Sequence, residues 1–428
     1  MRRIWATAER LIPRAVVAAT TVIAAAVTDP FSMGLYAWGV IAVTFLGTLT
    51  EWPLRQCGVA LIDSDNGRKL LRDSAQWAAG LGALLILCAL CAIAGLTTGH
   101  PVGAAFISLA PLILVPVAQC FAVEPTAVLQ RVGLWAKISL SRALASILSI
   151  AIGIPITLAT KNIIGASVTV AAAEFAYAIF SRLVALQHES ASTAPLGESN
   201  QEAVANFGKT LRHTAAFAAI SWLQGHADRG MLGAWAGTTA LGIYSLGSAM
   251  GRSAGEAISA SQLSILRVDL IANRARSDEE IRAILGRHLR SALILSMVGA
   301  VATLMLAHVL LRPLLGPQWN EAFQIVPILV LTSFPLTIAA SSTAVHIQRN
   351  KSKILFVAPT ICLAFAPAIA LAAITSLESA AWIYLSRECA LAAIQIFFMG
   401  RATPWREVGV AVAMVGFGTL LAISGFLN

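Results

Sequence analysis

The chain has 428 residues, of which 57% are hydrophobic and only 12% are charged, and its formal net charge is +9. This composition excludes an ordinary water-soluble globular protein, in which roughly 25% of residues are charged, and it indicates a chain that uses lipid as its solvent. Apolar stretches of the roughly 20 residues needed to cross a bilayer recur from end to end. Mostly short polar breaks separate them, so an extramembrane domain has no room to fold.

Apolar windows and helix breakers predict about thirteen membrane spans. The first span follows a basic segment and could be a signal peptide, but Asp29 and Pro30 follow it without a small-residue cleavage site. A first transmembrane helix is the simpler interpretation. In chain order the predicted spans cover residues 11–27, 34–61, 75–97, 102–123, 138–159, 163–186, 213–235, 238–260, 291–311, 322–345, 354–374, 379–399 and 407–427.

Basic residues occur in alternate loops between these spans, as expected when Lys and Arg accumulate on the cytoplasmic side. The intervening loops carry almost nothing basic except Lys161 and Arg312. This alternation predicts a cytoplasmic N-terminus and an outer C-terminus, and it explains the positive charge without a nucleic-acid partner. The basic segments are the N-terminus (Arg2, Arg3, Arg10, Arg14), Arg68-Lys69 with Arg72, Arg131 with Lys137, Lys209 with Arg212, the stretch Arg267 to Arg290, Arg349 with Lys351 and Lys353, and Arg401 with Arg406.

Two of the cytoplasmic connections are longer than the rest. The first, Gln187 to Arg212, is rich in Ser, Glu and Gly and is interpreted as a linker between two halves. The second, Ser261 to Arg290, carries four apolar residues at helical spacing among charges, which predicts an amphipathic helix on the inner membrane surface. These apolar residues are Ile281, Ile284, Leu285 and Leu289.

Three short motifs recur in the same order, and each joins one span to the span six further along, which indicates an internal duplication. No single match is specific, but chance seldom gives all three nearly the same offset along the chain. The matches are Gly34-Leu35-Tyr36-Ala37-Trp38-Gly39 with Gly242-Ile243-Tyr244-Ser245-Leu246-Gly247, Thr126-Ala127-Val128-Leu129-Gln130-Arg131 with Thr343-Ala344-Val345-His346-Ile347-Gln348-Arg349, and Glu174 with Glu388.

The predicted fold is therefore an all-α polytopic membrane protein with two six-helix lobes. Because six is even, both copies cross the membrane in the same sense and form parallel lobes. The lobes cover residues 1–186 and 213–399, a cytoplasmic linker covers 187–212, and one extra transmembrane helix lies in 400–428. Rocking of the lobes around a central cavity, that is, alternating access, is the expected mechanism.

At three places the chain resembles the multidrug/oligosaccharidyl-lipid/polysaccharide (MOP) exporter superfamily, and most closely its Wzx-type polysaccharide flippases. The resemblance covers the first twelve spans. Its motifs report the fold rather than the substrate, and thirteen spans depart from the twelve or fourteen common in the superfamily. The motifs are Asp29-Pro30-Phe31-Ser32-Met33-Gly34-Leu35-Tyr36, Ala227-Asp228-Arg229-Gly230-Met231-Leu232-Gly233 with Ala240-Leu241-Gly242-Ile243-Tyr244-Ser245, and Leu314-Leu315-Gly316-Pro317-Gln318-Trp319.

The resemblance implies a carrier in the bacterial cytoplasmic membrane. Its substrate would be a polyprenyl-pyrophosphate-linked oligosaccharide that moves to the outer leaflet for surface polysaccharide biosynthesis. The partners so implied are the lipid bilayer, this substrate and, as a candidate, a polysaccharide polymerase or another assembly protein. Neither catalytic residues nor a cofactor is expected.

Ionisable residues at bilayer depth are costly and usually face a cavity or a partner, so they are functional candidates. Arginine offers a planar fork of donors that suits phosphate oxygens. Arg55, Arg142, Arg229 and Arg252 are therefore the predicted substrate-binding residues. The alternative is charge compensation, because Glu51 with Arg55 and Arg252 with Glu256 are each four residues apart on one helical face.

The chain contains no phosphate-binding loop of the Walker type, so coupling to an ion gradient is the expected energy source. A carboxylate can exchange protons or help to hold sodium. Asp228 is the preferred coupling residue, followed by Glu51 and Glu256, with a structural ion pair to Arg229 or a neighbour as the alternative. The cysteine pair Cys88 and Cys91 lacks the second pair or histidines that a metal site requires, so no metal site is expected.

Two other functions remain open. An ion-coupled small-molecule exporter of the same superfamily would share both lobes and the acidic residues, although several arginines suit an anionic lipid better than a cationic drug. A membrane-embedded glycosyltransferase or polymerase would also handle polyprenyl substrates, but such enzymes usually need a large outer loop with catalytic groups. Each outer loop predicted here has only a few residues.

Overall fold

The computed structural model describes residues 16–62, 64–95, 102–187, 199–271, 277–349 and 352–424. Nearly all of these residues are helical. The predicted basic N-terminus and residues 188–198 of the predicted linker lie outside the described residues. After a first helix, Val16–Val27, the elements are α2 (Pro30–Leu49), α3 (Glu51–Leu61), α4 (Asp65–Gly95), α5 (Val102–Leu109), η1 (Ala110–Leu114), α6 (Val115–Phe121), α7 (Val123–Val132), α8 (Trp135–Thr160), α9 (Ile164–Leu186), α10 (Ser199–Trp235), α11 (Thr238–Ile271), α12 (Asp278–Met305), η3 (Leu306–Leu311), α13 (Arg312–Leu315), η4 (Pro317–Trp319), α14 (Asn320–Leu331), α15 (Ser333–Gln348), α16 (Ser352–Leu363), α17 (Phe365–Thr375), α18 (Leu377–Met399), η5 (Gly400–Ala402) and α19 (Trp405–Ile423).

The helices confirm a polytopic all-α membrane protein. Within the described residues, ten helices, counted across short breaks, are long and apolar enough to cross a membrane. The first helix is a shorter apolar one, and the predicted span that contains it begins in residues outside the description. The helices α10 and α11 coincide with the remaining two predicted spans, and they carry the buried charges described below.

The predicted surface helix after Ser261 is wrong. Its apolar residues lie in the first turns of α12, a continuous helix that runs on into the predicted ninth span. Ser277 caps this helix, accepting a hydrogen bond from the backbone N–H of Glu280, while the Glu280 side chain accepts one from the Ser277 N–H. The side chains of Ile281, Ile284 and Leu285 are buried with Leu266 and other apolar residues. The apolar face thus packs on protein rather than on lipid.

The chain divides into two compact units. Unit 1 comprises residues 1–28 and 35–223, and unit 2 comprises residues 29–34 and 224–428. The division falls within the helices α2 and α10, so each of these helices contributes to both units. The predicted lobe and linker limits stay a prediction.

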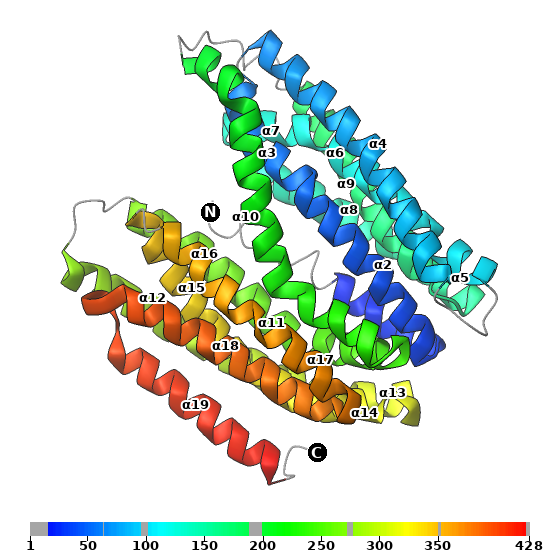
Figure 1. Cartoon of the computed structure of the whole chain (residues 1–428), viewed down its shortest axis with the longest axis vertical. Helices are drawn as coiled ribbons and strands as arrows, with labels where there is room; N and C mark the ends of the chain where they lie inside the picture. Colours follow the sequence, from blue (N-terminus) through cyan, green and yellow to red (C-terminus); the bar gives the residue numbers. More distant parts are fainter. Residues whose placement is uncertain are drawn as a thin grey trace. The chain divides into compact units, whose positions relative to one another are not determined.

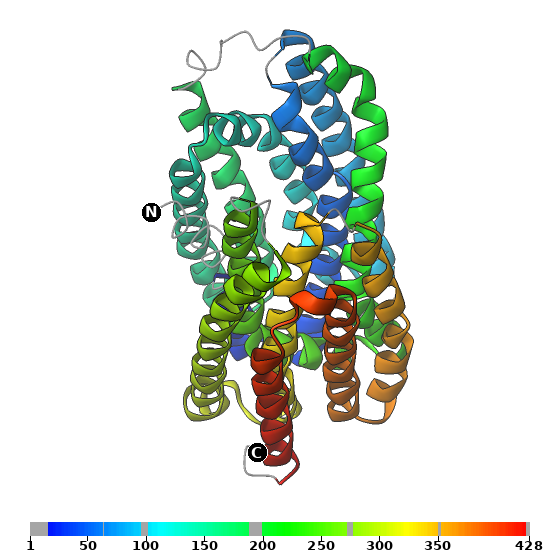
Figure 2. The same cartoon turned by 90° about the vertical axis from the view of Figure 1, so that its left-hand side faces the viewer.

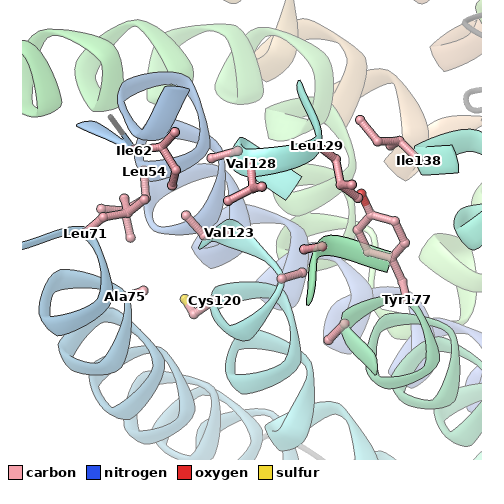
Figure 3. Close-up of a cluster of buried hydrophobic side chains, with 14 of the residues drawn as sticks. Leu54, Ile62, Leu71, Ala75, Cys120, Val123, Val128, Leu129, Ile138 and Tyr177 are labelled. Carbon is pink, nitrogen blue, oxygen red and sulfur yellow. The ribbon is translucent and has the colours of Figure 1, made fainter. Parts of the chain in front are cut away.

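In unit 1, α8 and α9 form an extensive antiparallel pair, and α6 lies between α4 and α9 (Figure 1). The two helices pack so closely that a Cβ on Gly153 would collide with Thr169, and a Cβ on Gly165 would collide with Thr157. Glycine, which has no Cβ, permits this close approach. Figure 3 shows an apolar cluster of this unit, in which side chains of α3, α4, α6, α7, α8 and α9 meet, among them Leu54, Leu71 and Tyr177.

In unit 2, the helices α14 and α15 form the most buried span, with α11, α12 and α18 packed around them. The last helix, α19, packs on α12, α14 and α15; it lies at the edge of this unit in Figure 1 and in front of the other helices of the unit in Figure 2. Glu407 of α19 accepts a hydrogen bond from Arg290 of α12 at 3.0 Å. This unit therefore contains the extra C-terminal helix that the sequence predicts.

Candidate functional site

Four charged side chains come together in unit 1, and we call them the N-terminal charged group: Glu51, Arg55, Arg142 and Glu174. Glu51 and Arg55 lie one turn apart on α3, with 3.4 Å between carboxylate and guanidinium. Arg142 of α8 and Glu174 of α9 form a tighter pair at 2.8 Å. The charges of Arg142 and Glu174 act on Glu51, so the two pairs are neighbours.

An aromatic ring supports the Arg142 guanidinium. The guanidinium lies over the ring of Tyr177, 4.1 Å from its centroid, in a cation–π arrangement. The Tyr177 hydroxyl in turn lies 3.1 Å from the Thr126 hydroxyl of α7. A small cavity of about 70 Å³ adjoins Arg142 and Glu174, and the side chains of Thr20 and Tyr36 also line it. Arg142 and Glu174 therefore border a cavity inside unit 1.

Six charged side chains come together in unit 2, and we call them the C-terminal charged group: Asp228, Arg229, Arg252, Glu256, Arg387 and Glu388. Arg387 of α18 is the most connected member. It donates hydrogen bonds to Glu388 at 2.6 Å and to the Gln224 backbone carbonyl at 3.0 Å, and it lies 3.9 Å from Asp228. Arg252 pairs with Glu256 at 2.8 Å.

Two tyrosines stand among these charges. The guanidiniums of Arg387 and Arg252 both lie over the ring of Tyr384, 4.1 Å and 4.4 Å from its centroid. The charges of Asp228, Arg229, Arg252 and Arg387 also act on Tyr244. Neither hydroxyl has a hydrogen-bond partner among the described residues, and neither do the two carboxylate oxygens of Asp228, a side chain with 0% exposure.

The structure brings each predicted site residue into one of the two groups. Glu51, Arg55 and Arg142 belong to the N-terminal group, and the other four belong to the C-terminal group. The two ion pairs expected from i, i+4 spacing, Glu51 with Arg55 and Arg252 with Glu256, are confirmed. For Asp228, the partner is Arg387 rather than the adjacent Arg229.

The predicted substrate-binding and ion-coupling residues include neither Arg387 nor the tyrosines Tyr177 and Tyr384. A signal exists in hindsight, because each repeat-related glutamate has a tyrosine close by on its own helix: Tyr177 follows Glu174 by three residues, and Tyr384 precedes Glu388 by four. In both units a guanidinium stacks on that tyrosine and bonds to that glutamate. The duplicated glutamates thus mark a duplicated arrangement of Arg, Glu and Tyr.

The charges within each group balance. The N-terminal group has two acids and two arginines, and the C-terminal group has three of each. A buried charge is costly unless it is paired, so this balance lets ionised side chains exist inside a membrane protein. Chemically, such groups can bind an anion at the guanidiniums or a proton or small cation at the carboxylates. Within the described residues, no three metal-ligating side chains are close enough together to hold a metal ion.

Comparisons with known proteins show the family through a sequence model and the fold through solved structures. A family model described as polysaccharide biosynthesis protein matches residues 23–324. No curated protein has a matching sequence. Among solved structures, the lipid II flippase MurJ in an inward closed conformation has a TM-score of 0.71 at 12% identity, over 99% of this chain and 92% of that one. An inward-facing multidrug resistance MATE family transporter of the MOP superfamily has a TM-score of 0.64 at 13% identity, over 92% and 97%. At these identities the likeness shows the fold alone.

Proposed function

The chain belongs to the family of polysaccharide biosynthesis proteins and has the fold of the MOP superfamily, and from this premise we propose that it is a flippase. It moves a polyprenyl-pyrophosphate-linked oligosaccharide across the bilayer by alternating access. The observation that carries the proposal is the presence, in the membrane spans of both units, of arginines held by tyrosine rings and carboxylates. A pyrophosphate is a concentrated anion, and arginine binds phosphate oxygens in a bidentate manner.

In this proposal the substrate pyrophosphate binds by replacing the carboxylate that pairs with an arginine. Arg55, Arg142, Arg229 and Arg252 are the substrate-binding residues. Arg142 and Arg252 each hold a carboxylate at 2.8 Å in the structure. A pyrophosphate would replace that carboxylate as the anionic partner, while the tyrosine ring keeps the guanidinium in place. Pairing in the absence of substrate lowers the cost of burying each arginine.

Ion coupling centres on Asp228. This carboxylate is fully buried, and the Arg387 guanidinium is its nearest cation at 3.9 Å. A proton or a sodium ion at Asp228 would compete with Arg387, which also bonds to Glu388 and to the Gln224 carbonyl. Cation binding would therefore loosen a contact between α10 and α18. Glu51 and Glu256 are secondary candidates for this role.

The cell location proposed is the bacterial cytoplasmic membrane, with the N-terminus inside. Basic side chains support this orientation in unit 1: Arg68, Lys69, Arg72 and Arg131 lie at helix ends that meet on one side, whereas Lys161 is the single basic residue of the α8–α9 turn at the other. A polysaccharide polymerase is the partner class that such a substrate would require.

The short connections support a transporter rather than an enzyme. Residues 161–163 join α8 to α9, residues 236–237 join α10 to α11, and Ser376 alone separates α17 from α18. Such turns have no room for the catalytic groups of a membrane-embedded glycosyltransferase.

A small-molecule exporter is the second candidate, because the balanced charges and the MATE-type fold would also suit a cationic substrate. Deletion of the gene separates the two functions. If the chain is a flippase, the deletion strain should lose surface glycan and accumulate the lipid-linked precursor, and its drug sensitivity should not change. Intact glycan without precursor accumulation, together with raised drug sensitivity, would establish the exporter instead.

A further inference from the structure

Unit 1 has a second cavity, separate from the charged groups, on the surface formed by α4, α6 and α9. Its volume is about 680 Å³, within the roughly 300–1,000 Å³ typical of sites for small ligands. Apolar side chains form most of its wall, among them Ala79 of α4, Phe121 of α6 and Ile179 of α9. Phe121 and Ile179 are more than half exposed. The cavity is therefore an open, apolar groove on a membrane-spanning surface.

One end of this groove is charged. Arg72 of α4 donates two hydrogen bonds to Glu124 of α7, at 2.8 Å and 3.1 Å, and Arg182 of α9 lies 3.7 Å from the same carboxylate. Two guanidiniums thus meet at one carboxylate at this end of the groove. Guanidiniums also bind phosphate oxygens in a bidentate manner, so the same end can take the phosphate of a lipid.

The charged end lies at the level of the membrane interface. Arg72 is near the start of α4 and Arg182 near the end of α9, the same side of the unit that carries Arg68 and Lys69. The neighbouring Trp77 is 82% exposed, and exposed tryptophans concentrate at the level of lipid headgroups. From Arg72 to Ala79 the groove follows α4 for about 10 Å, at 1.5 Å per residue, from that interface into the apolar layer.

We propose that this groove holds one acyl chain of an anionic phospholipid, with the lipid phosphate against Arg72 and Arg182. A phospholipid has this pattern of chemistry, a single negative phosphate at the interface and an apolar chain below it. Phospholipids also greatly outnumber lipid-linked saccharides in a membrane, so mass action favours them as occupant. The bound lipid fills the groove between three helices and tethers α4 to α9.

Native mass spectrometry of the full-length purified chain tests this inference. The probes are phosphatidylglycerol and phosphatidylcholine with identical acyl chains. We expect the wild type to retain one phosphatidylglycerol in strong preference to phosphatidylcholine. Arg72→Gln with Arg182→Gln should weaken phosphatidylglycerol retention on the order of thirtyfold, since each basic side chain near an anionic lipid contributes about fivefold to its binding. Lys69→Gln, an exposed charge one turn earlier on α4, is the matched control and should change nothing.

A second variant tests the apolar part of the groove. Ile179→Trp adds bulk to the exposed wall of the groove and should reduce retention of the lipid while Arg72 and Arg182 remain in place. Unchanged thermal melting in lipid-free detergent checks the fold. Equal retention of both phospholipids by the wild type would overturn the proposal, as would an equal loss in Lys69→Gln. Displacement of phosphatidylglycerol by equimolar polyprenyl phosphate would also overturn it, by assigning the groove to the substrate. None of these outcomes depends on flippase activity.

Discussion

Gly34 of α2 and Gly242 of α11, the first residues of the two copies of the repeated motif, lie against each other where their helices cross. A Cβ on Gly242 would stand 2.8 Å from the Gly34 backbone nitrogen and would overlap the Pro30 carbonyl oxygen. A Cβ on Gly34 would stand 2.7 Å from the carbonyl carbon of Thr238. Both helices thus approach backbone to backbone, which only glycine permits. The repeated motif thus supplies the glycine on both sides of this crossing.

Gly242→Ala should therefore destabilise the protein. The added methyl group has no space between the helices, and overpacking of this kind costs about 1–3 kcal/mol. Thermal melting of the detergent-solubilised protein measures the effect. Gly225→Ala on α10 is the control, because its Cβ would meet nothing within 4 Å. Equal melting temperatures for the two variants would contradict the close crossing.

Removal of the Arg387 guanidinium should have a larger effect. Arg387→Gln leaves Asp228 and Glu388 buried without their shared cation, and the loss of one partner of a buried pair costs about 3–5 kcal/mol. The double variant Arg387→Gln with Glu388→Gln should recover part of this loss, which a double-mutant cycle would quantify. The Arg290–Glu407 pair, whose arginine is 60% exposed, is the comparison and should contribute no more than about 1 kcal/mol. Similar losses at both pairs would contradict the burial argument.

Asp29 gives a pH-dependent contribution to stability. Partial burial raises the pKa of the Asp29 carboxyl, but hydrogen bonds from the backbone N–H and side chain of Ser32, together with those from the backbone of Asp29 and Phe31, outweigh it and hold the pKa below its ordinary value. A lowered folded-state pKa stabilises the fold at pH values above the unfolded-state pKa, about 3.9. This stabilisation is lost as the pH falls through the folded-state pKa.

Asp29→Ala should thus lower stability at pH 7 by ~0.5 kcal/mol, the low end for a helix N-cap because the carboxyl is only partly buried. Melting curves from pH 7 down to about 3 should show the difference from wild type narrowing below about pH 4. Asp29→Asn keeps acceptor capacity without titrating, so its difference from Asp29→Ala should stay constant. A gap between wild type and Asp29→Ala that widens on acidification would refute the assignment.

The sequence predicts the helices well because a membrane span is a local property, set by the length and hydropathy of one segment. The i, i+4 pairs are equally local, and both are confirmed. The contacts of Arg387 with Asp228 and the Gln224 carbonyl could not be predicted, because they join α18 to α10 across a long stretch of sequence. The error at Ile281 has another cause: helical periodicity identifies an apolar face but does not reveal whether lipid or protein covers it.

Paired neutralisation distinguishes substrate binding from charge compensation at Arg142. Arg142→Gln alone leaves Glu174 without its partner, so it impairs transport under either hypothesis. Arg142→Gln with Glu174→Gln restores the charge balance but removes the guanidinium. If Arg142 binds the substrate pyrophosphate, glycan export by the double variant should stay at least about tenfold below wild type, as expected for loss of a charged hydrogen bond. Export close to wild type would assign Arg142 to compensation.

Transport in a purified system tests the central claim most directly. The protein is reconstituted into liposomes that contain a fluorescent polyprenyl-pyrophosphate oligosaccharide, and an added membrane-impermeant glycosidase reports the fraction of substrate exposed outside. If the chain is a flippase, substrate that begins in the inner leaflet should become exposed only when the protein is present. The Arg142→Gln, Glu174→Gln double variant should be strongly impaired in this exposure. The account would be contradicted if substrate became exposed no faster than in protein-free liposomes. The same protein preparation would have to export a cationic dye under these conditions, which shows that it is active.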